Sequence, residues 1–285
     1  MAARNKFIAE AGGEELKIVL GWKINFRSLK MYLPDNKFIA WSAEFQHMID
    51  SRRATSKNLE SSIGKMIHVS QILPQVNHFL SRLRDLLTRA GNRRSIGVNN
   101  DCLADCRLMI KFLEKSRDGL SMNNLVFRLP DRCYRSDACP HGLGGYSDQG
   151  FAWRFYLPFE LLFRASNNLL EHLASIITVW IDILAFRLFP EDCVLSMTDN
   201  STSEGWAHKT NFSLLPEEVD CQVNPVEASA RISVARNFAD LCMDADICHF
   251  SQWFPGNEND VSDALSRDDD RSDDELTKNF IFLRT

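Results

Sequence analysis

The sequence predicts a mixed α/β (α+β) protein, in which a mainly helical segment with a β-hairpin precedes a mixed sheet flanked by helices. Two observations predict this fold class. Between residues 34 and 115, apolar side chains recur every three or four positions, which is typical of amphipathic helices. From residue 125 onward, short runs rich in aromatic and aliphatic residues alternate with longer helical patterns, which is typical of a sheet with helices on its faces.

The first segment opens with two apolar runs, residues 17–26 and 29–33, which predict the hairpin because only Arg27 and Ser28 separate them. Pro34 then begins a helix, since proline suits a first helical turn. The apolar stripe of that helix consists of Phe38, Trp41, Phe45 and Met48. The remaining helices of the segment are predicted over residues 56–73, 76–87 and 104–115.

The second segment predicts three strands in meander order, a long helix, a strand, two helices, a strand and a last helix. The three meander strands come from residues 132–136, 142–146 and 151–157. The later elements are a helix over 167–186, a strand over 193–198, helices over 203–209 and 225–243, a strand over 247–250 and a helix from residue 259.

Charge is distributed unevenly along the 285 residues. The net charge of −5 conceals a first part, residues 1–130, with 21 Lys and Arg against 12 Asp and Glu, and a remainder with 12 against 26. A basic part beside an acidic part suits a protein that binds a polyanion with one part and divalent metal with the other. A gradual drift of surface charge explains the same numbers.

Other classes of protein are disfavoured by composition. No apolar run reaches the length of a membrane span, and the first residues lack the apolar stretch of a secretory signal. The eight cysteines contain no CxxC pair, so neither a disulfide framework nor a thiolate zinc site is indicated. We therefore expect a cytoplasmic or nuclear protein that is not secreted and does not contact a membrane.

Four acidic residues stand in four different local contexts. Asp137 and Asp199 lie where apolar runs stop, Glu171 lies on the long helix, and Asp263 opens the last helix after a Pro-Gly turn. Carboxylates collected from separate elements are what a protein needs to hold two Mg²⁺ ions close together. Each also has a structural alternative: a turn former for Asp137 and Asp199, a solvated boundary residue for Glu171, and a helix N-terminal charge for Asp263.

Four strings around these acids resemble the ribonuclease H domain of retrotransposon reverse transcriptases. They are Ser136-Asp-Ala-Cys-Pro-His-Gly-Leu-Gly-Gly145, Asn168-Leu-Leu-Glu-His-Leu-Ala174, Thr198-Asp-Asn-Ser-Thr-Ser203, and Trp253-Phe-Pro-Gly-Asn-Glu-Asn-Asp-Val-Ser-Asp-Ala-Leu-Ser-Arg267. One such string alone is weak, whereas four in the same order are specific.

This resemblance implies endonucleolytic hydrolysis of the RNA strand of RNA–DNA hybrids. It further implies that Asp137, Glu171, Asp199 and Asp263 are catalytic and hold two Mg²⁺ ions, with Mn²⁺ able to substitute. Asn200, Trp206 and Lys209 are then candidates for contact with the nucleic acid, Asn200 through a ribose 2′-hydroxyl. A turn-forming role for Asn200 and a core role for Trp206 are the alternatives.

The basic part resembles the thumb and connection region of reverse transcriptases. The resemblance rests on Leu20-Gly-Trp-Lys-Ile24, Leu33-Pro-Asp-Asn-Lys37 and the run from Ile63 to Pro74. It implies that Gly64, Lys65 and His68 lie against a nucleic-acid duplex, where a glycine allows close approach. Close packing of two protein helices at Gly64 is the alternative. Five arginines, Arg82, Arg84, Arg89, Arg93 and Arg94, suggest either phosphate contact or a solvated face.

The sequence contains no Tyr-x-Asp-Asp turn and no other polymerase carboxylate motif before the hairpin, so polymerase activity is not expected. The predicted organisation is a thumb/connection-like segment over 1–120, a ribonuclease H-like domain over 121–270 and an acidic, partly disordered tail over 271–285. The expected partners are an RNA–DNA hybrid or another duplex, together with the polymerase portion of the same polyprotein. The alternative is an inactive relic that only binds duplex.

Overall fold

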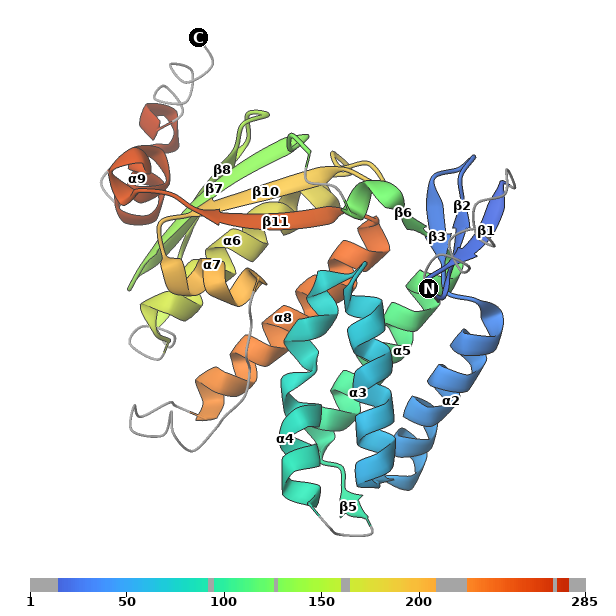
Figure 1. Cartoon of the computed structure of the whole chain (residues 1–285). Helices are drawn as coiled ribbons and strands as arrows, with labels where there is room; N and C mark the ends of the chain where they lie inside the picture. The colour runs from blue at the N-terminus through green and yellow to red at the C-terminus, as the bar shows by residue number, and fades with distance from the viewer. Residues whose placement is uncertain are drawn as a thin grey trace. The chain divides into compact units, whose positions relative to one another are not determined.

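The computed structural model describes residues 15–91, 95–125, 128–159, 165–208, 225–268 and 271–276. The chain divides into two compact units, Met1–Arg128 and Leu129–Thr285 (Figure 1). The division therefore falls after Arg128, whereas the predicted segments meet at residues 120 and 121. Across the described residues, no helix combines the length and apolar character that crossing a membrane requires.

The first unit contains a four-stranded antiparallel sheet in the order β1-β2-β3-β6. Its strands are β1 (Leu16–Val19), β2 (Trp22–Asn25), β3 (Lys30–Tyr32) and β6 (Leu120–Ser121). The run over 17–26 is thus two strands rather than one. Leu20 and Gly21 reverse the chain between them with φ values of 49° and 85°, in the left-handed region that glycine adopts most easily.

Helices make up most of the rest of this unit. They are α2 (Asp35–Ser51), α3 (Ser56–Ser70), α4 (Ser81–Ala90) and α5 (Asn100–Asp118), with 3-10 turns η1 (Pro74–Phe79) and η2 (Met122–Leu125) and a short ribbon of β4 (Arg53–Ala54) and β5 (Ile96–Gly97). Phe45, Leu59 and Phe112 are fully buried between them. The predicted helix over 76–87 is wrong as a single helix, because η1 ends at Phe79 and α4 begins at Ser81.

One buried ion pair joins α4 to α5. The Arg82 guanidinium donates from Nε and Nη2 to the two oxygens of Asp105 at 2.5 and 2.6 Å, and the Asp105 side chain is 0% exposed. Of the five arginines proposed for phosphate contact, Arg82 is therefore engaged inside the protein. Arg93 and Arg94 lie outside the described residues.

We expect Arg82→Met to lower the free energy of unfolding by about 3–5 kcal/mol, because it leaves the buried Asp105 charge without a partner. Chemical denaturation measures this change. The control is Arg27→Met, which breaks an exposed pair with Glu15 and should cost less than about 1 kcal/mol. Equal losses in the two variants would contradict the assignment.

The second unit is built on a five-stranded mixed sheet in the order β11-β10-β7-β8-β9. The strands are β7 (Arg132–Cys139), β8 (Gly142–Ser147), β9 (Ala152–Tyr156), β10 (Cys193–Thr198) and β11 (Cys248–Trp253). The first three form an antiparallel meander, and β10 lies parallel to both β7 and β11. The predicted meander, and with it the fold class, is confirmed.

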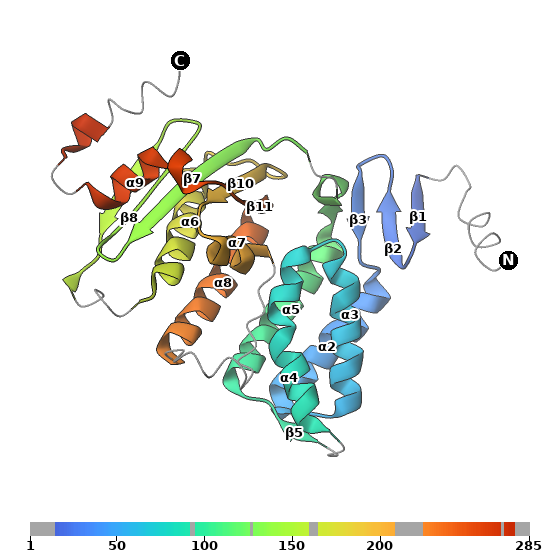
Figure 2. The ribbon, with the colours of Figure 1, turned by 60° about the vertical axis from the view of Figure 1, so that its left-hand side comes forward.

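Helices cover both faces of this sheet (Figures 1 and 2). They are α6 (Asn167–Leu184), α7 (Ser201–His208), α8 (Pro225–Ala245) and α9 (Asp260–Arg267), with a 3-10 turn η5 (Gly256–Glu258). A side chain at Gly144 would meet Leu265 of α9, whereas one at the next residue, Gly145, would meet Thr178 of α6. Successive strand residues point to opposite faces, so α6 and α9 pack on opposite sides of β8. This arrangement is consistent with a ribonuclease H-like domain.

Candidate metal centre

Two of the predicted acids meet where β10 separates from β7. The register of the two parallel strands ends with Met197 beside Arg135. Asp137 lies two residues farther along β7, and Asp199 follows the last residue of β10. Because the strands run in the same direction, both carboxylates reach the same edge of the sheet. The apolar run that stops at Asp199 is a sequence signal for this position. Asp137 instead lies inside β7, which continues to Cys139, so the predicted strand over 132–136 is too short and a strand-end turn does not describe Asp137.

Glu171 reaches the same place from α6. The helix begins at a Ser166 N-cap, whose hydroxyl accepts a hydrogen bond from the Leu169 N–H at 3.3 Å. Its first turns pack through Leu170 and Ala174 on Ala138 of β7. At the far end of the helix, the Tyr134 hydroxyl donates to Asp182 at 2.6 Å. The helix is therefore fixed to β7 at both ends, which sets the position of Glu171.

The structure brings Asp137, Glu171 and Asp199 together. One oxygen from each carboxylate lies within 4.8 Å of the others. Asp137 and Glu171 are buried, at 2% and 3% exposure, and the Glu171 Oε2 atom has no hydrogen-bond partner. A buried carboxylate oxygen without a partner is costly, and carboxylate oxygens are the ligands that hard divalent cations prefer. The donor set therefore fits a divalent cation.

Crowding and burial favour the protonated forms of these acids. Burial, together with the charges of Asp137 and Asp199, raises the pKa of Glu171 to about 9. Burial also raises the pKa of Asp137, although the Ser266 hydroxyl and the Arg267 charge oppose the rise. The pKa of Asp199 is raised by burial too, with a contribution from Asp263. For Asp137 and Asp199, burial outweighs the opposing charge of Arg267.

Asp263 lies outside the group of three. It is on α9, its side chain is 51% exposed, and it pairs with Arg267 of the same helix at 2.6 Å. Arg267 also lies 3.7 Å from Asp137, so the fourth acid stands beside the other three without joining them. Burial raises the pKa of Asp263, and the charge of Arg267 opposes this rise.

Glycines explain how α9 comes so close to the sheet. A Cβ atom at Gly142 would lie 2.2 Å from the Ser266 carbonyl oxygen, and one at Gly144 would lie 2.5 Å from Leu265 Cβ. The Gly-x-Gly of β8 is therefore the surface on which the backbone of α9 packs. The same approach lets the Ser266 hydroxyl donate a short hydrogen bond to Asp137.

The Pro-Gly turn before α9 closes against Asp199. The Trp253 indole donates to the Asp199 carbonyl at 2.8 Å. A Cβ atom at Gly256 would lie 2.8 Å from the Asp199 carboxylate, so only glycine fits without moving that side chain. Gly256 and Ser266 were part of the sequence strings, but nothing in the sequence alone indicated their contacts with the acids.

Two of the predicted nucleic-acid contacts follow β10. The Asn200 side-chain oxygen accepts hydrogen bonds from the N–H groups of Thr202 and Ser203, both at 2.9 Å, and so caps α7. The Trp206 ring is half-buried; it packs edge-on against His172 and lies under the Arg231 guanidinium. The turn-forming alternative describes the contacts of Asn200, whereas Trp206 is half-buried rather than part of the core. Lys209 lies outside the described residues.

The predicted contacts in the first unit occupy α3. Gly64 is exposed, and a Cβ atom there would meet nothing within 4 Å, so close helix packing does not explain this glycine in the described structure. Lys65 pairs with Glu44 of α2. His68 stacks on Trp22 with ring centroids 5.3 Å apart, and burial followed by the Lys37 charge lowers its pKa. Of Gly64, Lys65 and His68, only Gly64 is exposed with free space next to its backbone.

No protein-family model matches the chain, and no curated protein does. Among solved structures, the foamy viral protease–reverse transcriptase resembles it in three complexes. These are the form called dRH with double-stranded DNA (12% identity, TM-score 0.30), the enzyme with an RNA/DNA hybrid (14%, 0.30) and the enzyme with double-stranded DNA (12%, 0.31). Each match covers 84% of this chain but only 38%, 29% and 45% of those chains, respectively. At these values the resemblance assigns neither a family nor an activity to this chain.

Protonation of Glu171 gives the folded protein a measurable dependence on pH. Between the usual value of 4.5 and about 9, the folded chain keeps a proton that the unfolded chain has released. The free energy of unfolding therefore falls as the pH rises through this window. Glu171→Gln cannot ionise, so at about pH 8 without divalent cations we expect it to be more stable than the parent by on the order of 2 kcal/mol.

Urea unfolding at several pH values across this window measures how steeply the free energy of unfolding falls with pH, for the parent and for Glu171→Gln. The control is Asp148→Asn, which changes an exposed carboxylate whose oxygen accepts a hydrogen bond from the Cys133 N–H at 3.2 Å. It should keep the slope of the parent. A Glu171→Gln protein with the parent's slope would contradict the raised pKa.

Proposed function

We propose that this chain is a metal-dependent endonuclease that cleaves the RNA strand of RNA–DNA hybrids, as the ribonuclease H part of a retrotransposon reverse transcriptase. The observation that carries the proposal is the group of Asp137, Glu171 and Asp199, with oxygens within 4.8 Å of one another. The four sequence strings support the same assignment, because each of them holds one of the acids.

The acids would hold Mg²⁺, or Mn²⁺ in its place. Asp137, Glu171 and Asp199 would hold one ion, and Asp263 would join Asp137 in holding a second. When bound, a pair of divalent cations lowers the pKa of a water molecule, which makes it a better nucleophile toward phosphorus, and neutralises charge on the leaving oxygen. The partner-free Glu171 Oε2 atom supports this, since it gives a cation a ligand that no protein donor occupies.

The protein residues would act by holding geometry. Ser266 donates a hydrogen bond to Oδ2 of Asp137 and would fix the orientation of that carboxylate. Trp253 and the turn at Gly256 fix Asp199 from the side of β11. Because Asp137 lies within β7 and Asp199 directly follows β10, the proposed ligands would keep their separation when a substrate binds.

Each unit carries residues that would contact a duplex. The basic first unit would contact phosphates, and the open backbone of α3 at Gly64 would allow close approach to a groove. Lys65, His68 and Trp206 already make contacts within the protein, so a role in binding nucleic acid would require them to exchange these contacts.

The test uses Asp137→Asn and Asp199→Asn with a labelled RNA–DNA hybrid in Mg²⁺. Each variant is expected to cleave at least about 100-fold more slowly than the parent, because losing even an outer partner of a metal ligand costs 10- to 100-fold. Asp148→Asn is the matched control, since it replaces an acid at the end of another strand, and it should cleave like the parent.

If both variants cleave the hybrid at the parent's rate, the proposed function is contradicted. A parent that binds the hybrid with a steep salt dependence but leaves the RNA intact would instead establish the alternative, a relic that only binds duplex. Fluorescence anisotropy at several salt concentrations separates these two results.

The Gly256 contact gives a second test. Gly256→Ala would push the Asp199 carboxylate aside, so we expect its affinity for Mn²⁺ to fall by about ten-fold or more. Isothermal titration calorimetry with Mn²⁺ measures this. The control is Gly205→Ala on α7, where a Cβ atom meets nothing within 4 Å and alanine favours the helix. Equal Mn²⁺ affinity in the two variants would argue against Asp199 as a ligand.

A further inference from the structure

The helix that carries Asp263 is short. It spans the eight residues Asp260–Arg267, and no side-chain hydrogen bond caps its N-terminus. Isolated helices of this length are not stable, so contacts with the rest of the unit must hold it. The Asp263 carboxylate pairs with Arg267 of the same helix, and this pair therefore moves with the helix.

The N-terminal end of α9 is tied to β7. Asn259, which is 1% exposed, donates from its side chain to the Ser136 carbonyl at 3.2 Å. Arg135 donates to the Glu258 carbonyl at 2.9 Å and lies over the Phe254 ring. These contacts fix where the helix begins, but they leave its direction to contacts farther along.

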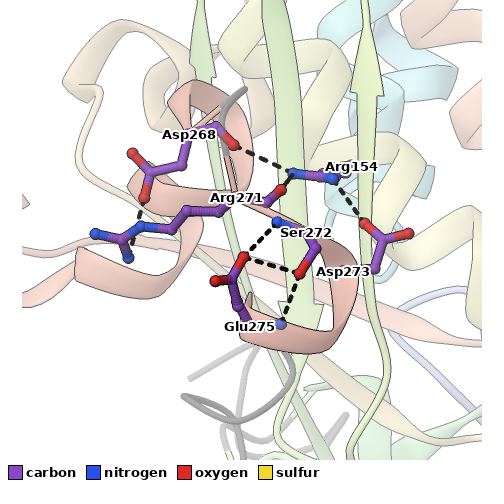
Figure 3. Close-up of polar contacts among 6 residues, drawn as sticks. All are labelled: Arg154, Asp268, Arg271, Ser272, Asp273 and Glu275. Carbon is purple, nitrogen blue, oxygen red and sulfur yellow. Dashed lines mark hydrogen bonds and ion pairs between the residues drawn. The ribbon is translucent and has the colours of Figure 1, made fainter.

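The C-terminal end of α9 lies against β7 and β8 through Ser266 and Leu265, and Arg154 ties it to β9 as well (Figure 3). Its guanidinium donates to the carbonyl oxygens of Asp268 and Arg271 at 3.2 and 3.0 Å. It also pairs with the Asp273 carboxylate at 2.8 Å, and its side chain is only 18% exposed. Asp268 is the C-cap of α9, so the guanidinium meets carbonyls that lack a partner within a helix.

After α9, residues 273–276 are helical and Ser272 directly precedes them. The Ser272 N–H and hydroxyl both donate to the Glu275 carboxylate at 2.8 Å, and the Glu275 N–H donates back to the Ser272 hydroxyl at 3.3 Å (Figure 3). This reciprocal arrangement is a capping box. Leu276 is buried at 4% exposure. The acidic stretch is thus ordered over residues 271–276, and it presents Asp273 to Arg154.

We propose that Arg154 is a positioning residue that fixes the end of α9 and thereby holds Asp263 beside the three-carboxylate group. A guanidinium suits this role because its planar fork can serve several acceptors at once, which a lysine ammonium cannot do in the same geometry. The part of this inference that concerns metal rests on the proposed function. The part that concerns α9 stands on the contacts alone.

The first experiment measures hydrogen exchange of the full chain without metal. In Arg154→Met, the amides of α9 should exchange roughly ten-fold faster or more, because charged donors to the end carbonyls are lost. The amides of α6 should exchange as in the parent. Arg154→Lys should show a smaller acceleration, and Asp273→Asn, which removes only an exposed partner, should change exchange by less than about five-fold.

The second experiment measures Mn²⁺ binding by electron paramagnetic resonance in a double-mutant cycle. If Arg154 acts through Asp263, Arg154→Met should weaken Mn²⁺ binding in the parent but cause no further loss in Asp263→Asn. Equal losses in both backgrounds would mean a general structural role and would overturn the proposal. Unchanged exchange of the α9 amides in Arg154→Met would overturn it as well.

The two proposals fail in different ways. A parent chain that binds no Mn²⁺ would contradict the proposed metal-dependent function, and the exchange of α9 would still decide whether Arg154 holds the helix. A parent that binds Mn²⁺, with an Arg154→Met variant that binds it equally well, would contradict the positioning role alone.

Discussion

Mutual repulsion among Asp137, Glu171 and Asp199 is the constraint on which the rest of the second unit depends. Three carboxylates with oxygens within 4.8 Å of one another, two of them buried, are unfavourable as anions. The fold holds them together by attaching each to a different rigid element: β7, α6 and the end of β10. The energy for this comes from packing elsewhere, such as the Ala138, Leu170 and Ala174 cluster. Packing energy thus keeps three acids close together, in a group that could hold a divalent cation.

The elements and their order could be predicted from the sequence because each follows a local pattern. The apolar run that stops at Asp199 and the 3.6-residue stripe around Glu171 required no knowledge of tertiary structure. Asp137 and Asp199 meet because β7 and β10 are parallel neighbours, and Glu171 joins them from α6.

The remaining features depend on contacts between distant parts of the chain. The turn at Leu20 and Gly21 divides a run that reads as one strand, and the break at Leu80 divides a run that reads as one helix. The Arg82–Asp105 pair could not be predicted from the sequence, because an arginine in a buried ion pair and an arginine on a basic surface can have the same sequence neighbours. Likewise, the acidic residues after α9 resemble a solvated tail, yet Arg154 and the Ser272 capping box order residues 271–276.

The glycines of β8 have a consequence for the order of folding. Gly144 meets Leu265 although more than a hundred residues of chain separate them, so this contact carries a large entropic cost of loop closure. The meander and α6 involve much shorter separations and can form before α9 is available. The contacts of Ser266 and Arg267 with Asp137 span a similar length of chain, so they too depend on closing this long loop.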